Sequence, residues 1–438
     1  MSLASSFREF VLSLSYVMTQ PTFQSLLVVL AGWVFASRRT VTGMIQTAGA
    51  VEVKHHSAFH RVFAAARWSL DALGLAMFEM IFEWLAKDQP VFLAADDTLA
   101  RKRGLKIFGV GMHHDPILSS RGKAIVNWGH SWVVLGVLLP FPFRKDHWFC
   151  LPILFRLYRS RQTTGREGGD HRSRPELAME MLQLLCRTYP STRFHVVTDA
   201  IYSGKSILQE LPPNCDITGR LHLDARLFDL PPKRRPGTFG RPRKRGARRP
   251  SPRQMLKTGG YNLTLDIYGR HETSRVVECT ALWYSSGGSR PLRIVAVEPL
   301  TSARKIQAFY STDLSASAQD ILRWRARRWA IEVTFHDAKG YLGFEEPQGW
   351  TKKAVERTAP MAMLLYSLII LWFAKEGHRH LCFPHRPWYA RKSSITFVDM
   401  LRTLREQSLK ETFIKPSLHT APMQKTIESL IKLAAKAA

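Results

Sequence analysis

The hydrophobic pattern of the chain changes near residue 90, and this change limits the possible folds. Four short runs follow that are apolar or β-branched: PVFLAADD at 90–97, LKIFGVGMH at 105–113, SWVVLGVLL at 131–139 and FHVVTDA at 194–200. Runs of this kind, bounded by Gly, Pro, Asp or Ser, are typical of strands. The stretch at 175–189 has helical periodicity and separates the last two runs. Strands followed by alternating helix and strand predict a mixed α/β sheet.

Helices are expected before and after this region, because residues 1–88 and 394–437 have helical patterns. Two apolar runs are too short to span a membrane. Leu26–Ala36 has eleven residues and Met361–Ala374 has fourteen, whereas a bilayer requires about 20. Both are therefore predicted to be buried helices. The first residues also lack the pattern of a signal peptide, so no membrane association is expected.

A basic block at residues 231–253 stands apart from both patterns. It contains ten Lys or Arg residues, six Pro and no acid. Such a composition cannot bury a core and predicts a loop or a disordered segment. Strand-like alternation returns within residues 259–300.

The charge balance indicates the kind of partner. Lys and Arg number 63 against 35 Asp and Glu, a net charge of +28, and the pI is about 10.3. Such an excess usually serves to bind a polyanion, either nucleic acid or an anionic membrane surface. The five cysteines form no CxxC pair, which argues against a disulfide framework or structural zinc and indicates a reducing, cytosolic setting. Nucleic acid is therefore the leading candidate.

Glu332 lies among apolar and basic residues in the stretch RRWAIEVTFHDAKG, residues 327–340. A helix is predicted over 318–339, starting at a capping box formed by Ser317 and Asp320 and ending at Gly340. At 100° per residue, four cationic or polar side chains lie within about 40° of Glu332: Arg325, Arg328, His336 and Lys339. The simplest interpretation is an i,i+4 ion pair between Arg328 and Glu332 on the helix surface.

Three further acids follow predicted strands. Asp96 and Asp97 end the first run, and Asp199 ends the fourth. Each could be an ordinary turn residue or helix cap, but sites in open α/β sheets gather at the carboxyl ends of strands. Carboxylates from two strands and the Glu332 helix would repel one another without a cation. Their oxygens suit Mg²⁺ or Mn²⁺, and two such ions can catalyse phosphodiester cleavage.

These residues resemble the DDE superfamily of insertion-sequence transposases, a group with a Tyr-x2-Arg-x3-Glu-x6-Lys helix signature. Arg328, Glu332 and Lys339 match it, whereas Arg325 stands at the Tyr position. An Asp-x-Thr element matches DDT at 96–98, and the second acid matches Asp199 in VVTDAIYSG. Further similar stretches, including NWGHSWVVLG and VERTAPMAMLLYSL, extend the resemblance over most of the chain.

The resemblance implies an RNase H-like α/β core interrupted by a β-rich insertion. The implied organisation is a helical DNA-binding domain at 1–88, core segments at 89–222 and 301–376, a basic insertion at 223–300 and a helical tail at 377–438. The implied metal ligands and catalytic residues are Asp96, Asp199 and Glu332, with Asp97 as the alternative to Asp96, and the implied cofactor is two Mg²⁺ or Mn²⁺ ions.

The implied DNA contacts lie in two places. In the signature helix they are Arg325, Arg328 and Lys339. In the basic block, FGRPRKRG resembles an AT-hook, although Phe239 replaces its usual Arg, and the contacts are Arg241, Arg243, Lys244 and Arg245. A solvated charge run that adds only nonspecific phosphate contacts explains this block equally well.

The expected activity is cut-and-paste transposition: cleavage of double-stranded DNA at terminal inverted repeats, then strand transfer into target DNA. A homodimer is expected because two ends must be paired. The expected location is the bacterial cytoplasm, in association with the nucleoid. Two alternatives remain open. One is a catalytically silent, domesticated transposase that only binds DNA, and the other is an RNase H-like nuclease specific for branched structures.

Overall fold

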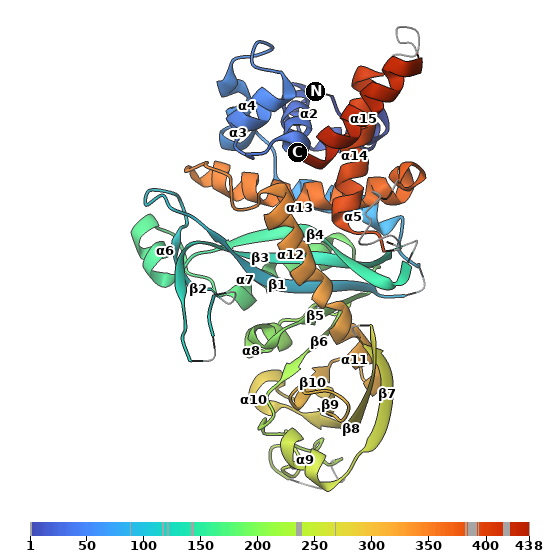
Figure 1. Cartoon of the computed structure of the whole chain (residues 1–438). Helices are drawn as coiled ribbons and strands as arrows, with labels where there is room; N and C mark the ends of the chain where they lie inside the picture. The colour runs from blue at the N-terminus through green and yellow to red at the C-terminus, as the bar shows by residue number, and fades with distance from the viewer. Residues whose placement is uncertain are drawn as a thin grey trace.

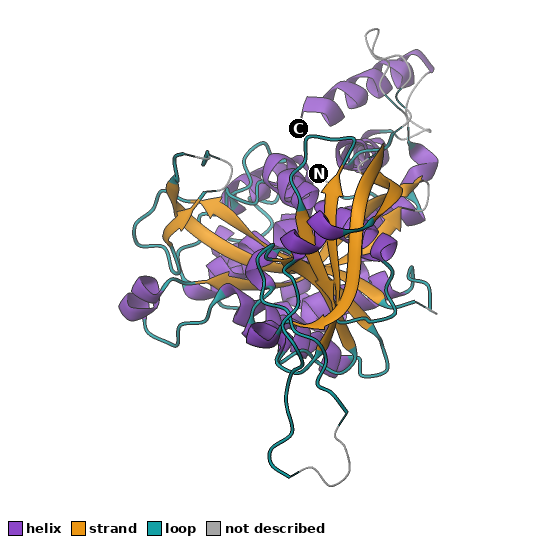
Figure 2. Cartoon of the chain, turned by 90° about the horizontal axis from the view of Figure 1, so that it is seen from below, coloured by secondary structure: helices purple, strands orange, loops and turns teal. Residues whose placement is uncertain are grey.

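The structure is a computed structural model in which one long sheet separates two groups of helices (Figure 1). It describes residues 2–87, 89–115, 118–120, 122–141, 144–233, 239–267, 269–381, 383, 392, 394–414 and 421–437. The amino-terminal and carboxy-terminal helices lie together at one end of the molecule, and the insertion lies at the other. Figure 2 shows the strands gathered into one body with helices around it.

The first part of the chain is helical, as predicted. Its helices are α1 Ser5–Leu12, α2 Gln20–Phe35, α3 Val41–Ala48, α4 His56–Ala64 and α5 Leu70–Phe82. The second and third pack very closely, since a Cβ added to Gly32 would lie 1.9 Å from the Met44 carbonyl oxygen. A side chain at position 32 would therefore push α3 away from α2.

The central sheet has the RNase H-like arrangement that was expected. Its strands are β1 Val91–Arg101, β2 Gly111–His114, β3 Val126–Phe141, β4 Arg144–Tyr158, β5 Phe194–Thr198 and β6 Cys215–Leu221. The core order is β4-β3-β1-β5-β6, in which β4, β3 and β1 are antiparallel while β1, β5 and β6 are parallel. The short β2 pairs with the amino-terminal end of β3. Most of the run at 105–113 is therefore loop rather than strand.

Several short helices connect these strands. They are α6 Arg161–Glu167, α7 Arg174–Thr188 and α8 Lys205–Leu208. The first residue of α7 follows a capping box, in which Ser173 and Glu176 each bond the other's backbone N–H. The helix packs against β3 and β4 and accounts for the helical pattern at 175–189.

The insertion is β-rich, and its strands extend the core sheet. They are β7 Tyr261–Ile267, β8 Arg270–Leu282 and β9 Pro291–Pro299, with α9 Pro252–Thr258 and α10 Tyr284–Gly287 beside them. The strand β10 Gln307–Ser311 follows the expected end of the insertion at residue 300. β10 pairs with both β6 and β9, so the sheet continues as β6-β10-β9-β8-β7. The insertion is therefore joined to the core by backbone hydrogen bonds.

The described part of the basic block is anchored at its base. Phe228 and Arg248 form an antiparallel bridge, and Arg249 pairs with Asp229 at 2.8 Å. The last two residues of the block, 252 and 253, already belong to α9. The prediction that the loop extends to residue 253 is therefore wrong for these two residues. A helix begins there because Ser251 and Gln254 form a capping box with Pro252 at the first helical position.

The predicted helix over 318–339 is two helices, α11 Ala318–Arg327 and α12 Trp329–Leu342, divided at Arg328. The capping box of Ser317 and Asp320 is confirmed. The predicted end at Gly340 is wrong, because α12 continues to Leu342. It ends at Gly343, whose φ of 61° is the left-handed conformation that suits glycine.

The remaining helices are α13 Lys352–Lys375, α14 Phe397–Phe413 and α15 Ala421–Ala437. Among the described helices, α13 is long and apolar enough to cross a membrane, but 94% of its apolar window is buried inside the protein. It contains the run 361–374, and the run 26–36 falls largely in the buried helix α2. The terminal helices meet directly, since Arg405 Nε donates to the Val34 carbonyl oxygen at 2.8 Å.

His195 in β5 is predicted to make the fold sensitive to acid. Its Nε2 lies 2.8 Å from Thr218 Oγ1, its ring packs on Trp324, and burial lowers its pKa to about 4. Between pH 6.5 and 4 the unfolded chain therefore binds a proton that the folded chain does not. The free energy of unfolding should therefore decrease as the pH decreases through this window, by about 1.4 kcal/mol per pH unit from this group.

Urea unfolding between pH 7.5 and 4.5 measures this slope. The variant His195→Gln should show a smaller loss on acidification, even if it is less stable at every pH. Parallel curves for the two proteins would contradict the assignment.

Candidate active site

Asp96 and Asp97 lie in the middle of β1, whereas the sequence predicted them at its end. The strand continues to Arg101 because its antiparallel pairing with β3 extends to Gly129. Successive strand residues point to opposite faces of a sheet. Asp96 contacts Arg328 at the junction of α11 and α12, and Asp97 contacts Arg174 at the start of α7. The two neighbouring acids thus belong to different environments.

Arg328 joins Asp96 to Glu332. Its Nη1 donates to Asp96 Oδ2, and its Nη2 donates to Glu332 Oε1 at 2.6 Å. The Arg328 side chain is only 4% exposed. The i,i+4 pair expected from the sequence is therefore present, but it is buried and includes a third partner from the sheet.

Asp199 follows β5 directly, as predicted, and Arg325 Nη2 lies 3.3 Å from its Oδ1. Burial alone lowers the pKa of Arg328, and the charges of Asp96, Glu332 and Asp199 raise it above its usual value. Charges act on one another appreciably only at short range inside a protein. Asp96 and Glu332 therefore contact one buried guanidinium, whereas Asp199 pairs with Arg325 and acts on Arg328 only through its charge.

Burial raises the pKa of Asp96 to about 6, against the opposing effect of Arg328. The neighbouring charges of Asp97 and Asp199 contribute to this rise of the pKa. A carboxylate removed from water is unfavourable unless a cation or several donors compensate it. Besides Arg328, Asp96 has the Asp97 backbone N–H, which donates to its Oδ1 at 2.9 Å.

Asp97 has a separate set of partners that the sequence analysis missed. Arg174 Nε lies 3.0 Å from its Oδ2, and Tyr202 Oη donates to its Oδ1 at 3.1 Å. Arg174 also stacks on Tyr158, with its Cζ 4.2 Å from the ring centre. These residues come from three distant segments, and nothing in their local sequence signals the contact.

The carboxy-terminal part of α12 is attached to β1 through a network that the sequence did not suggest. Lys339 Nζ donates to the Leu99 carbonyl oxygen at 2.7 Å and lies 3.7 Å from Glu345 Oε1. Lys102 Nζ donates to the carbonyl oxygens of Glu345 and Pro347 at 2.7 and 2.8 Å. Lys339, expected to contact DNA, is therefore held by protein groups here.

Comparison with known proteins identifies the family. A family model described as DDE superfamily endonuclease matches residues 14–274, more than half of the chain. The chain belongs to this family. The matched region of this DDE superfamily endonuclease contains Asp96 and Asp199 but ends before Glu332. The contacts of Arg328 link Glu332 to Asp96.

Two further comparisons add little to this assignment. A search of curated proteins finds no match. Among solved structures, the DDE endonuclease chain resembles the piggyBac transposase in a cryo-EM structure of its synaptic complex with hairpin DNA. The TM-score is 0.39 at 12% identity, covering 98% of this chain and 80% of the other. At this TM-score the likeness carries no weight of its own.

The donor chemistry of the site fits a hard divalent cation, but its present arrangement does not form a ligand set. Carboxylate oxygens are the ligands that Mg²⁺ and Mn²⁺ prefer. Among the described residues, no group of three or more His, Cys, Asp or Glu side chains is arranged to hold a metal ion. Arg328 lies between two of the three acids, so ligation by all three requires its guanidinium to move.

The cations of the basic block belong to the insertion. Arg241, Arg243 and Lys244 are exposed. Arg245 Cζ lies 4.3 Å from the Phe228 ring centre and 5.2 Å from that of Tyr284. These two aromatic rings therefore hold the carboxy-terminal side of the loop against the insertion.

Removing the Arg328 guanidinium is predicted to destabilise the protein through Asp96. The variant Arg328→Gln leaves a buried carboxylate without its counter-ion, which costs about 3–5 kcal/mol in comparable pairs. The double variant Asp96→Asn with Arg328→Gln should recover much of this loss. Urea unfolding at pH 7.5 measures the wild type, the single variants Asp96→Asn and Arg328→Gln, and the double variant.

Arg379→Gln is the matched control, because Arg379 pairs with Glu376 on the surface and its side chain is 63% exposed. This change should alter stability by less than about 1 kcal/mol. Strict additivity of the Asp96 and Arg328 effects would show that their pairing contributes nothing.

Proposed function

We propose that this DDE superfamily endonuclease is a metal-dependent DNA transposase. It would cleave double-stranded DNA at terminal inverted repeats and join the freed ends to target DNA. The observation that carries the proposal is that Arg328 contacts both Asp96 and Glu332, while Asp199 pairs with Arg325 three residues earlier in the chain. Acids from separate strands and a distant helix are thus held by two neighbouring arginines, and the family membership makes phosphodiester cleavage the reaction to expect.

In the proposed mechanism the three acids bind divalent metal and Arg328 changes partners. Two Mg²⁺ or Mn²⁺ ions would supply activation of the nucleophile and stabilisation of the leaving oxygen. Asp96, Asp199 and Glu332 would hold them with their carboxylate oxygens. Arg328, released from Asp96, is then placed to bind a phosphate oxygen, since a guanidinium binds carboxylate and phosphate with the same geometry.

The bonds formed and broken are those of two successive displacements at phosphorus. In the first, a water oxygen bonds to the phosphorus, and the 3′ oxygen leaves and takes a proton. In the second, that 3′-hydroxyl loses its proton and attacks a target phosphodiester, releasing another 3′-hydroxyl. No atom changes its oxidation state, so the chemistry requires only positioning of the reacting groups and stabilisation of charge.

The partners follow from the same proposal. The net charge of +28 suits a protein that binds two lengths of DNA, the element end and the target. One chain supplies one set of three acids, and pairing two ends therefore calls for a homodimer. The proposed location is the bacterial cytoplasm, in association with the nucleoid.

Substituting the acids tests the chemistry. Glu332→Gln, Asp96→Asn and Asp199→Asn should each lower Mg²⁺-dependent nicking of end-containing DNA by at least about 10³-fold. Glu298→Gln is a matched control in the insertion, where Glu298 pairs with Arg275, and it should nick like the wild type. EDTA should abolish nicking in all proteins while leaving their DNA affinity unchanged.

The same assay separates the alternatives. Equal nicking by wild type and Glu332→Gln would remove Glu332 from the mechanism. DNA binding without any nicking by the wild type would favour the catalytically silent protein. Cleavage of branched DNA with no preference for element ends would favour a structure-specific nuclease.

The exposed cations of the insertion loop should contribute to binding through phosphate contacts. Neutralising Arg241, Arg243 and Lys244 together should lower the slope of log affinity against log salt by up to about 0.9 per lost phosphate contact. Neutralising Lys425, Lys432 and Lys436, which are exposed on α15, changes the charge equally and serves as the control. Equal slopes for the two triple variants would make the loop a spacer.

A further inference from the structure

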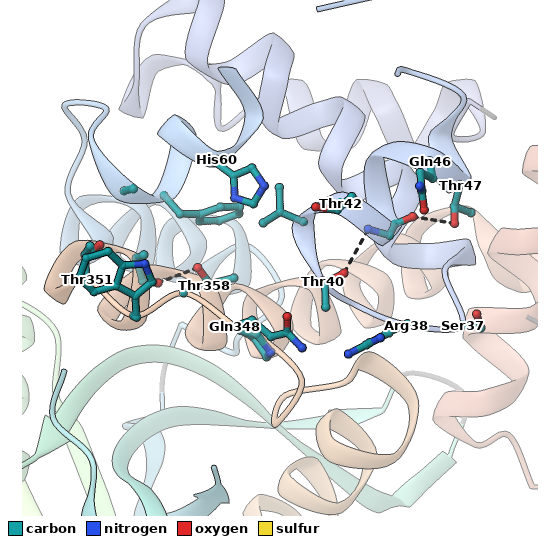
Figure 3. A pocket seen from close by; sticks show the side chains of 18 residues that line it. Ser37, Arg38, Thr40, Thr42, Gln46, Thr47, His60, Gln348, Thr351 and Thr358 are labelled. Atoms are coloured by element: carbon teal, nitrogen blue, oxygen red, sulfur yellow. Dashed lines mark hydrogen bonds between the residues drawn. The ribbon is translucent and has the colours of Figure 1, made fainter. Parts of the chain in front are cut away.

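A cavity of about 750 Å³ lies between the amino-terminal helices and the segment that follows α12 (Figure 3). Helices α3 and α4 form one wall, and residues 347–351 with the start of α13 form the other. None of the described residues that line it is acidic, and Arg38 stands at its edge. A polar cavity without acids in a protein of this charge suits an anionic ligand.

A second hollow of about 520 Å³ adjoins the first, because both are lined by Trp350 and Thr351. Its walls include Lys106, Lys352 and Arg166. Glu167 is the acid among the described residues that line it, and its two carboxylate oxygens accept from the Gly109 N–H at 3.0 Å. The two hollows have Trp350 and Thr351 in common and are lined by four Lys or Arg side chains against one acid, and they are together called the nucleotide groove here.

Trp350 stands where the two hollows meet, with its side chain largely in solvent. It is 67% exposed, although a large ring of this kind is usually buried. Its carbonyl oxygen accepts from the Phe108 N–H at 3.0 Å, so its backbone is held while its ring is free to contact a ligand. An exposed aromatic ring between cations is the arrangement that stacks nucleic acid bases.

The walls of the first hollow carry groups suited to base edges. Thr42 and Gln46 are exposed on one face of α3, and Gln348 is exposed opposite them. The hydroxyl of Thr351 is buried and has no hydrogen-bond partner among the described residues. Amide side chains can bond base edges in pairs, and an unsatisfied buried hydroxyl is costly unless a ligand completes it.

The groove is attached to the helix that carries Glu332. Trp33 Nε1 donates to the Leu342 carbonyl oxygen at 2.8 Å, at the end of α12. The Arg39 backbone N–H donates to Glu346 Oε2 at 2.5 Å. The end of α2, through Trp33, and the turn that follows it, through Arg39, are thus bonded to the bend that leads from α12 to the groove wall.

From these contacts we propose that the nucleotide groove binds a DNA strand of the element end, with a base stacked on Trp350 and the backbone beside Arg38 and Lys352. This inference rests on the proposed function and specifies where the end is held. Because the α2–α3 turn is bonded to the α12 segment, a strand in the groove would be positioned relative to Asp96 and Glu332.

Binding without metal tests the groove independently of cleavage. Fluorescence anisotropy in EDTA, with an element-end duplex that carries an unpaired terminal strand, should show that Trp350→Ala weakens binding by about 5- to 100-fold. Trp350→Phe, which retains a stacking ring, should bind within about threefold of the wild type. Tyr16→Ala removes a ring that is 68% exposed and lines neither hollow, and it should bind normally.

A second pair of variants tests the polar walls. Gln46→Ala with Gln348→Ala should weaken binding to the element end more than to an unrelated duplex, because amides contribute through base edges. Arg187→Ala, an exposed position on α7, is the control for surface changes. Thermal unfolding of each variant identifies any that does not fold, and the other pair then carries the test.

The outcomes distinguish the groove from the proposed reaction. Normal DNA affinity in Trp350→Ala and in the double glutamine variant would overturn the groove, even if nicking still depends on Glu332. Loss of affinity in both, with no nicking by the wild type, would support the groove and refute the transposase. The groove would also be supported if the protein binds single-stranded DNA more tightly than duplex DNA and Trp350→Ala weakens that binding by the same factor.

Discussion

The buried contact of Arg328 with Asp96 and Glu332 is the interaction on which the site depends. Two carboxylates that approach one another inside a protein require a positive charge between them. Arg328 provides it at the point where α11 ends and α12 begins. The same contact attaches the helix to the sheet and holds two acids within reach of one guanidinium, so the fold and the proposed chemistry share one cause.

The guanidinium that neutralises these two carboxylates can also be exchanged for another cation. A divalent cation can replace a guanidinium between carboxylates, since both satisfy the same oxygens with positive charge. The released Arg328 would then be available to a phosphate, beside the acids that it previously neutralised. Asp97, which Arg174 and Tyr202 hold on the other face, would remain in place and support the strand.

Two structural attachments connect this centre to the rest of the molecule. On one side, β10 pairs with both β6 and β9, so the strands of the insertion continue the core sheet. On the other, Trp33 and Arg39 bond the segment after α12, so the amino-terminal helices are fastened near the centre. Regions that would contact DNA at separate places therefore share one framework, as proposed positioning of an end requires.

The sequence by itself determined the features that depend on neighbouring residues: the strand and helix patterns, the capping box at Ser317, and Asp96, Asp199 and Glu332 as candidate acids through a family resemblance. Tertiary structure alone decided which face Asp96 occupies, how far β1 extends, and that the signature helix divides at Arg328. It also brought Arg174 to Asp97 and left Trp350 exposed between two hollows. Local periodicity specifies elements, but contacts between residues hundreds of positions apart arise only from packing, which no short window of sequence contains.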